Sequence, residues 1–313
     1  MVIFSLEVNM ESVIQALYRL LDKHEPTDIY PFNEGWSDDA KFIVEPKSDN
    51  KYLLRLSNID KASRAKRQVK IIEQAIAANI PTQIVVDHGT CLDDEKYFIL
   101  LKWIEAEPLL DKILSYSEDV QYNLGRTAGQ HLQKIHQFST TYSTGLDWDV
   151  LFNRKIDKKL EMYENCPLKY DRDRELIEAV QTYRKKLSAT AQVVHHGDYH
   201  LGNMLIDKNH VIHIIDFDRH DVGDGWDEFN RLPFSYDVSP AFASGLVDAY
   251  FNNEIPHRFW EMVCLYTATN ALSSLPWALR FGDDEITTIK HQTESLYRQY
   301  NDFNSVIPAW YQQ

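Results

Sequence analysis

Residues 195–218 read HHGDYHLGNMLIDKNHVIHIIDFD, and they contain the most specific motif of the chain. Asp198 and Asn203 lie five residues apart in it, and an apolar run follows Asn203. A polar break at residues 207–210 and a second apolar run then lead to Asp216. Short apolar runs on either side of a polar break are typical of a two-stranded β-hairpin. Since a hairpin folds back on itself, we expect it to bring Asn203, at its entrance, close to Asp216, at its exit.

Two carboxylates and one amide at a single point match the needs of phosphoryl transfer. That reaction uses a carboxylate to orient the attacking hydroxyl and accept its proton, and Mg²⁺ to bridge the phosphates. Mg²⁺ prefers oxygen ligands and keeps several waters, so one or two carboxylates and an amide oxygen suffice. We assign Asp198 as the base, and Asn203 and Asp216 as metal ligands. Taken singly, an Asp or Asn beside Gly more often forms a turn than a catalytic site. The full pattern consists of H-G-D-x-H-x-x-N, then a hairpin, then I-D-F-D, and only this combination favours catalysis.

Residues 196–203 and 215–218, which carry this pattern, resemble the motifs of the aminoglycoside phosphotransferase family. That family also includes macrolide, choline and homoserine kinases and shares the protein-kinase-like fold. The resemblance implies an α+β, bilobal protein. Residues 1–102 would form a small antiparallel β-sheet lobe that binds the nucleotide. Residues 103–313 would form a larger, mostly helical lobe with the catalytic loop and the acceptor site.

Further roles follow from the resemblance alone. It implies ATP or GTP as the phosphoryl donor with Mg²⁺ as the metal. His196 belongs to the catalytic loop, where we expect it to hold the loop rather than act as a base. The family's G-D-x-x-x-D segment corresponds here to residues 223–227, and we expect Asp227 to brace the catalytic loop from below. Asp218 is a candidate for a second metal or for a supporting role.

Other residues of the first lobe would bind the nucleotide. A G-x-S turn often covers the phosphates in the family, and Gly35 and Ser37 fit it; without the resemblance this segment would be an ordinary hairpin turn. Arg55 stands where kinase-like folds usually carry the strand lysine that grips the phosphates, and arginine is also suited to phosphate. Gln68 is the nearest match to the glutamate that pairs with that lysine. Leu101 and Trp103 mark the hinge whose backbone binds adenine.

Residue periodicity predicts the regular elements. The predicted strands are 41–45, 51–56, 81–86 and 97–101, in an antiparallel sheet of about five strands. The predicted helices are 10–23, 61–79, 118–137, 147–165, 173–187, 240–252, 256–280 and 284–302.

The acceptor would bind among the late helices, as in the related antibiotic kinases. Near the catalytic stretch we expect acceptor contacts from Asp224, Trp226, Glu228 and Asn230. For Asn270, further along the chain, a packing or surface role is favoured. The net charge of −14 would steer a cationic acceptor such as an aminoglycoside, and antibiotic resistance would follow. A macrolide or a metabolite such as choline remains an alternative.

Composition sets the remaining limits. The chain has 313 residues, which suits two lobes. It has no basic stripe for nucleic acid and no apolar run that could span a membrane. Three cysteines without metal spacing are typical of free thiols in a reducing cytosol, so we expect a cytoplasmic protein.

Two other functions remain open on these grounds. One is a Ser/Thr protein kinase, although no A-P-E segment or long activation loop follows Asp216. The other is a nucleotide-binding protein without catalysis, which Arg55 and Gln68 would favour.

Overall fold

The computed structural model describes residues 10–33, 39–47 and 50–311. Contacts between Cα atoms divide the chain into two compact units. The first comprises Met1–Ala106 and Asp207–Asp218, and the second comprises Glu107–Ile206 and Arg219–Gln313. The predicted lobe boundary between residues 102 and 103 stays a prediction.

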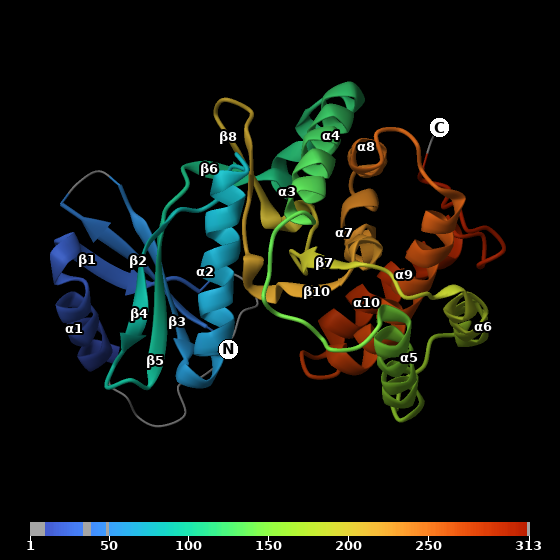
Figure 1. The fold of residues 1–313 in the computed structure, drawn as a ribbon, viewed down its shortest axis with the longest axis horizontal. Helices are drawn as coiled ribbons and strands as arrows, with labels where there is room; N and C mark the ends of the chain where they lie inside the picture. Colours follow the sequence, from blue (N-terminus) through green and yellow to red (C-terminus); the bar gives the residue numbers. More distant parts are fainter. Residues whose placement is uncertain (1–9, 34–38, 48–49, 312–313) are drawn as a thin grey trace. The chain divides into compact units, whose positions relative to one another are not determined.

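The first unit contains a five-stranded antiparallel sheet in the order β1-β2-β3-β5-β4 (Figure 1). Its strands are β1 (Pro26–Pro31), β2 (Ala40–Pro46), β3 (Tyr52–Asn58), β4 (Val85–Cys91) and β5 (Lys96–Lys102). This confirms the predicted fold class for the first lobe.

The face of a residue in this sheet follows from strand alternation. Phe42 lies opposite Leu54, and Leu54 lies opposite Leu100, so the three share one face. They form a buried core with Leu17 of helix α1 (Met10–Leu20). Arg55, the next residue along β3, therefore lies on the other face of the sheet.

The prediction of a strand at 81–86 is wrong by several residues, since β4 begins at Val85 and ends at Cys91. Its position is set by the turn that joins it to β5. There Leu92, Asp93 and Asp94 have positive φ angles of 52°, 56° and 64°, and the backbone N–H of Glu95 donates to Leu92. Asp tolerates this left-handed conformation, and the pairing of the two strands extends outward from the turn.

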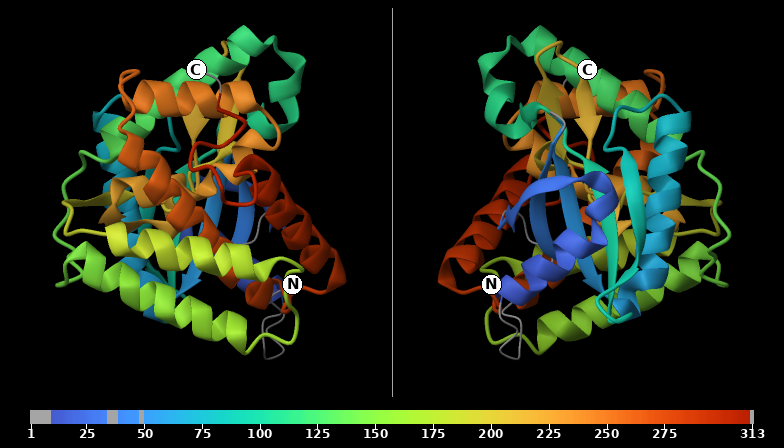
Figure 2. Two further views of the ribbon diagram at one scale, coloured as in Figure 1. Left: turned by 90° about the vertical axis from the view of Figure 1, so that its right-hand side faces the viewer. Right: turned by 90° about the vertical axis from the view of Figure 1, so that its left-hand side faces the viewer.

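The second unit is mostly helical, as predicted, and each of its predicted helices is present to within a few residues at either end. Strands β7 (Gln192–His195) and β10 (Asp221–Asp224) pair antiparallel in it. The helices are α3 (Leu109–Lys112), α4 (Glu118–Ile135), α5 (Trp148–Glu164), α6 (Asp173–Tyr183), α7 (Pro233–Tyr236), α8 (Pro240–Tyr250), α9 (His257–Ala278) and α10 (Asp283–Gln299). Helices α5, α6 and α10 all contact α9 (Figure 2). Across the described residues, every helix is too short or too polar to span a bilayer.

Helices α4 and α8 touch backbone to backbone. A Cβ atom added at Gly129 would lie 2.2 Å from the carbonyl oxygen of Leu246, and one at Gly245 would lie 2.1 Å from that of Tyr122. No side chain fits in so small a space, so glycine on both helices permits the approach. Tyr199 of the predicted catalytic loop donates its hydroxyl to the backbone oxygen of Ala128 on α4 at 2.6 Å, so α4 supports this loop directly.

Candidate active site

The predicted catalytic loop begins where β7 ends. His195 pairs with Asp221 of β10, so the backbone after β7 runs close to the residues before β10. Gly197 has φ of +87°, and a Cβ atom there would lie 1.9 Å from the carbonyl oxygen of Arg219. Both facts require glycine. The H-G-D sequence therefore places Asp198 at a sharp turn directly beside Arg219.

Three basic side chains surround the Asp198 carboxylate. Arg231 Nε is 3.1 Å from one oxygen and Arg219 Nε is 3.7 Å from the other. His200 Nε2 lies 3.6 Å away. Burial by itself would raise the pKa of Asp198, but the contact with His200 and the charges of the two arginines hold that pKa well below its ordinary value. Asp198 is therefore ionised at neutral pH and can accept a hydrogen bond from a hydroxyl.

Asn203 is oriented by the same loop. It ends the short 3₁₀ turn Leu201–Asn203, and its Nδ2 donates to the backbone oxygen of Asp198 at 2.8 Å. Because the amide nitrogen is held by the loop, the amide oxygen is the atom left to coordinate a metal.

Glu228 supports this loop from the 3₁₀ segment Gly225–Arg231. Its two carboxylate oxygens accept the backbone N–H groups of His196 at 2.7 Å and Gly197 at 2.9 Å. The side chain is buried. Burial would raise the pKa of Glu228, but His136 and the nearby charges of His195 and His196 lower it to about 2. Glu228 therefore holds the loop as an anion.

The structure thus corrects one expectation, because Glu228 and not Asp227 braces the loop. Asp227 instead accepts a bond from the Asn230 side chain at 3.2 Å. The signal was in the sequence: the sixth position of G-D-x-x-x-D, counted from Gly223, is residue 228. A glutamate stands there in place of the aspartate.

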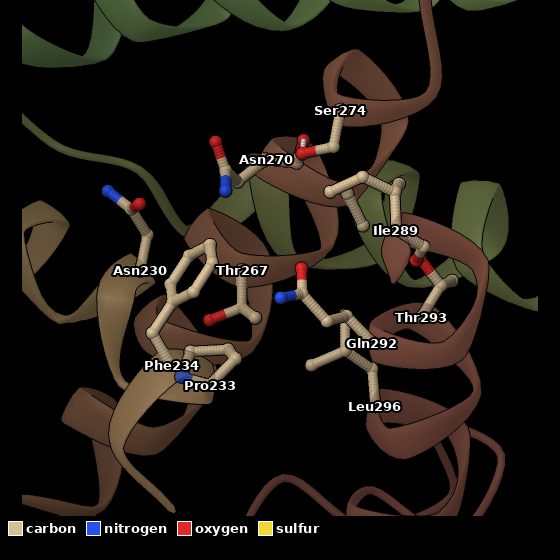
Figure 3. Close-up of a pocket in the computed structure, with 11 residues that line it drawn as sticks. Asn230, Pro233, Phe234, Thr267, Asn270, Ser274, Ile289, Gln292, Thr293 and Leu296 are labelled. Carbon is tan, nitrogen blue, oxygen red and sulfur yellow. Dashed lines mark hydrogen bonds between the residues drawn. The ribbon is translucent and has the colours of Figure 1, made fainter. Parts of the chain in front are cut away.

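The four residues expected to contact an acceptor have different surroundings. Asp224 is buried and accepts from Tyr266 Oη at 2.6 Å and from the backbone of Trp226 at 3.1 Å. The rings of Trp226 and Phe259 are in contact. The carboxylate oxygens of Asp224 and Glu228 thus accept hydrogen bonds from other groups of the protein. Asn230 lines a small hollow together with residues of α9 and α10 (Figure 3).

In the first unit, Arg55 is buried among three carboxylates. Its guanidinium is 3.0 Å from Asp39, 3.1 Å from Asp216 and 3.5 Å from Asp218. Burial would lower the pKa of Arg55, but the three carboxylates raise it. Lys41 lies opposite Arg55 on β2, so the same face carries a second cation. Arg55 therefore orients Asp216, a contact that the sequence did not predict.

The backbone at Asp216 is unusual. Its φ is +65°, a conformation rare for residues other than glycine and most accessible to Asn and Asp. Arg64 of helix α2 (Ala62–Ala77) donates to the backbone oxygen of Asp218 at 2.7 Å. Arg55 of the sheet thus holds Asp216 itself, and α2 holds the backbone two residues further on, at Asp218.

The other nucleotide-site candidates also belong to the first unit. Gln68 is buried on α2, and Leu101 is buried on β5. The backbone N–H of Trp103 donates to Lys51 at 2.9 Å. Gly35 and Ser37 lie outside the described residues.

The turn of the predicted hairpin is present at residues 207–210. Asp207 Oδ1 accepts the backbone N–H groups of Asn209 and Val211 at 2.8 and 2.9 Å. Asn203 belongs to the second unit and Asp216 to the first, so their convergence stays a prediction. Over the described residues there is no group of three or more His, Cys, Asp or Glu that could hold a metal. Mg²⁺ needs no such group, because the substrate phosphates supply part of its shell.

A small antiparallel sheet, a helical second unit and a loop with a braced carboxylate define a kinase-like phosphotransferase. Residues 28–260 match the model of the phosphotransferase enzyme family. The chain belongs to this family and is a phosphotransferase that uses a nucleotide and acts on a hydroxyl group of a small molecule. A comparison with curated protein sequences found no match.

Solved structures agree on the fold. A GDP and kanamycin complex of an aminoglycoside phosphotransferase has 17% identity and a TM-score of 0.73, covering 91% of this chain and 98% of that chain. A second aminoglycoside phosphotransferase has 14% identity and a TM-score of 0.69, with coverage of 93% and 99%. An amicoumacin kinase, solved with AMP-PNP and Ca²⁺, has 12% identity and a TM-score of 0.66, with coverage of 97% and 98%.

Proposed function

We propose that this protein transfers the γ-phosphate of ATP or GTP, bound with Mg²⁺, to a hydroxyl of a small molecule. The supporting observation is the Asp198 carboxylate, which is kept ionised by Arg231 and Arg219 on a loop that Glu228 braces. In the reaction, the acceptor oxygen bonds to the γ-phosphorus as the bond to the β,γ-bridging oxygen breaks. The hydroxyl proton goes to Asp198. The products are a nucleoside diphosphate and a phosphate monoester.

Three further residues, Asn203, Asp216 and His196, have roles in this proposal. The oxygens of Asn203 and Asp216 would hold Mg²⁺, which neutralises charge on the phosphates. His196 would position the loop, since it is buried and its backbone N–H is bound to Glu228. The low pKa of Asp198 makes it a weak base. It would therefore act mainly by orienting the hydroxyl and would take the proton late in the step.

Nucleotide turnover with and without Mg²⁺ tests this function directly. Chelation of the metal should abolish ADP or GDP release, and readdition should restore it. Asp216→Asn is the sharpest variant, because Asn retains the φ of +65° while losing one charge. We expect it to weaken Mg²⁺-nucleotide binding with folding preserved, whereas Asp216→Ala also strains the backbone. Turnover that is unchanged in Asp216→Asn would refute the metal role.

The same assay addresses the alternatives. Phosphate transfer to peptides but to no small alcohol would favour a protein kinase. Nucleotide binding without any turnover would favour a protein that only binds nucleotide, and the carboxylates around Arg55 are the feature that supports it. Antibiotic modification in the cytoplasm is one form of the proposed function, with a cationic aminoglycoside as the acceptor expected from net charge.

A further inference from the structure

Two cations lie directly opposite each other in the sheet of the first unit. Lys41 of β2 pairs with Arg55 of β3 (Figure 1), and residues paired in this way have their side chains on the same face, with Cβ atoms about 5 Å apart. The next residues along the two strands, Phe42 and Leu54, point the other way, into the core with α1. Like charges in directly opposite positions destabilise a sheet, so anions must lie close to this pair.

The donor groups of Arg55 are directed at carboxylates. Its Nη1 donates to Asp216 at 3.1 Å, and its Nη2 donates to Asp39 at 3.0 Å and lies 3.5 Å from Asp218. The Arg55 side chain is buried. A phosphate could reach the guanidinium only by displacing a carboxylate, and a buried charge that loses its partner is strongly unfavourable. Arg55 is therefore committed to the carboxylates and is poorly placed to bind a nucleotide.

The exposed part of this cluster is anionic. One cation among three carboxylates leaves two negative charges uncompensated. The side chains of Asp216 and Asp218 are 40% and 33% exposed, against 6% for Arg55, so an approaching phosphate meets carboxylate oxygens first. Like charges repel strongly where solvent is partly excluded. The Mg²⁺ of the proposed reaction offsets part of this repulsion, and a cationic side chain beside the cluster would offset more of it.

Lys41 is placed to supply that cation. Its side chain is only partly buried, unlike that of Arg55. Burial lowers the pKa of Lys41 and the charge of Arg55 lowers it further, while Asp216, Asp39 and Asp218 raise it. These carboxylates lie near enough to act on the ammonium, so Lys41 faces the same cluster. An added phosphate would favour the charged form, and lysine binds phosphate as a compact point charge on a flexible stem.

Arg64 of α2 also lies beside the cluster. Its Nε donates to the backbone oxygen of Asp218 at 2.7 Å. This bond holds the guanidinium against the chain segment that carries the carboxylates. Arg64 thus has a structural contact of its own, and it is the matched comparison for Lys41.

We propose that Lys41 of β2 binds the phosphates of the donor nucleotide, and that Arg55 stays paired with the carboxylates when the nucleotide binds. This inference rests on the proposed function and specifies how its donor is held. The ammonium of Lys41 donates to non-bridging phosphate oxygens, and the oxygens of Asp216 remain for the metal. Arg55 then occupies the place of the strand lysine of kinase-like folds, but Lys41 performs its task.

Nucleotide affinity tests this assignment without any catalytic step. Lys41→Met removes the ammonium but keeps a flexible stem, and Lys41→Arg restores a positive charge. Titration calorimetry with ATP and with GTP, each with Mg²⁺, measures the affinity. We expect Kd to be at least about tenfold higher in Lys41→Met, because a hydrogen bond to a charged group is lost. Most of the affinity should return in Lys41→Arg, and Arg64→Met should have a smaller effect.

Three results would overturn the proposal. One is a Lys41→Met protein that binds nucleotide as tightly as the unmodified chain. Another is a loss in Lys41→Arg as large as that in Lys41→Met, because the charge would then not be what binds. The third is a loss in Arg64→Met that equals or exceeds the loss in Lys41→Met.

Chemical labelling of the unmodified protein gives a measurement that does not depend on the folding of a variant. Lysines are acetylated with acetic anhydride, and mass spectrometry gives the extent of reaction at each lysine. We expect ATP or GTP to protect Lys41, and adenosine or guanosine to protect it much less. Lys158, exposed on α5, is the control and should react equally in every sample. Equal labelling of Lys41 with and without the nucleotide would contradict its contact with the phosphates.

The two proposals fail in different ways. If the protein binds no nucleotide, the proposed function fails. If nucleotide is bound and turned over in an Asp198-dependent manner while Lys41→Met keeps full affinity, the function stands and the assignment of Lys41 is wrong.

Discussion

The carboxylate of Glu228 accepts the backbone N–H of Gly197 at 2.9 Å, one residue before the proposed base. Its second oxygen accepts from His196. Since backbone amides are bound, the contact fixes the path of the loop and not merely one side chain. We therefore expect Glu228 to influence activity by positioning Asp198.

Glu228→Gln should lower both stability and activity. The amide nitrogen of Gln cannot accept, so one buried N–H loses its partner, at a cost of about 1–3 kcal/mol. We expect this loss in urea unfolding, together with a lower kcat. Glu178→Gln is the matched control, because Glu178 is mostly exposed and pairs with Arg174 on the same helix. It should cost well under about 1 kcal/mol. Equal losses in the two variants would refute the bracing role.

The lowered pKa of Glu228 predicts an acid limit of stability. Its ordinary pKa is 4.5, and in the folded protein it is about 2. A carboxyl group whose pKa is lower in the folded than in the unfolded protein stabilises the folded state. This contribution is complete above pH 4.5 and is lost as the pH falls toward 2. Asp198 contributes in the same direction. Unfolding free energies measured from pH 5 to 2 should fall less steeply in Glu228→Gln. If the unfolding free energy falls equally steeply in both proteins, the ionised Glu228 carboxylate does not stabilise the fold.

Asp198→Ala should reduce kcat by roughly 10²–10⁴-fold, the range for losing a positioned base. Asp198→Asn should also be severely impaired, although it preserves the shape of the side chain. Circular dichroism serves to establish that both variants are folded, and acceptor-dependent nucleotide turnover measures the loss. Full activity in either variant would remove Asp198 from the mechanism.

Arg55→Ala should destabilise the protein strongly. The variant removes the guanidinium that lies 3.0 Å from the buried Asp39 carboxylate, and breaking a buried ion pair costs about 3–5 kcal/mol. Arg55 and Asp39 have side-chain exposures of only 6% and 7%, so solvent screens this pair little. Arg55→Lys keeps the charge but contacts fewer carboxylates, and we expect a smaller drop in Tm. An unchanged Tm in Arg55→Ala would show that the cluster is not structural.

Gly129→Ala should destabilise the protein although alanine normally favours a helix. The added Cβ would meet the Leu246 carbonyl at 2.2 Å, and overpacking of this kind costs about 1–3 kcal/mol. Gly89→Ala is the comparison, because its Cβ would meet only the Phe98 ring at 3.4 Å. Thermal unfolding of the two variants gives the difference, and equal Tm values would contradict a backbone contact between α4 and α8.

Local signals predicted much of this structure. The hairpin turn followed from the polar residues at 207–210, and strand 51–56 followed from a largely apolar run after a polar turn, because both depend on neighbours in sequence. Asp207 closes the turn with bonds only two and four residues away. The error at 81–86 arose because β4 takes its position from a turn at residues 92–94, where Asp was not recognised as a left-handed residue.

Contacts between distant residues were not predictable in this way. The pairing of Asp198 with Arg231 and the bond from His196 to Glu228 each join segments more than 30 residues apart in the chain. They depend on the pairing of β7 with β10, for which no local pattern exists. The carboxylates around Arg55 were missed for the same reason. Glu228 was passed over for a different reason, because the motif taken from the resemblance was matched to residues 223–227 and so ended one residue early, at Asp227.

The glycines between α4 and α8 bear on how any collection of inactive variants is interpreted. Random mutagenesis followed by selection for lost activity should recover changes at Gly129 and Gly245 alongside changes at Asp198, since both groups lower activity. We expect the former to lower the amount of folded protein, whereas the latter leave that amount unchanged and lower turnover. Measuring soluble protein for every isolate would therefore separate the scaffold from the chemistry.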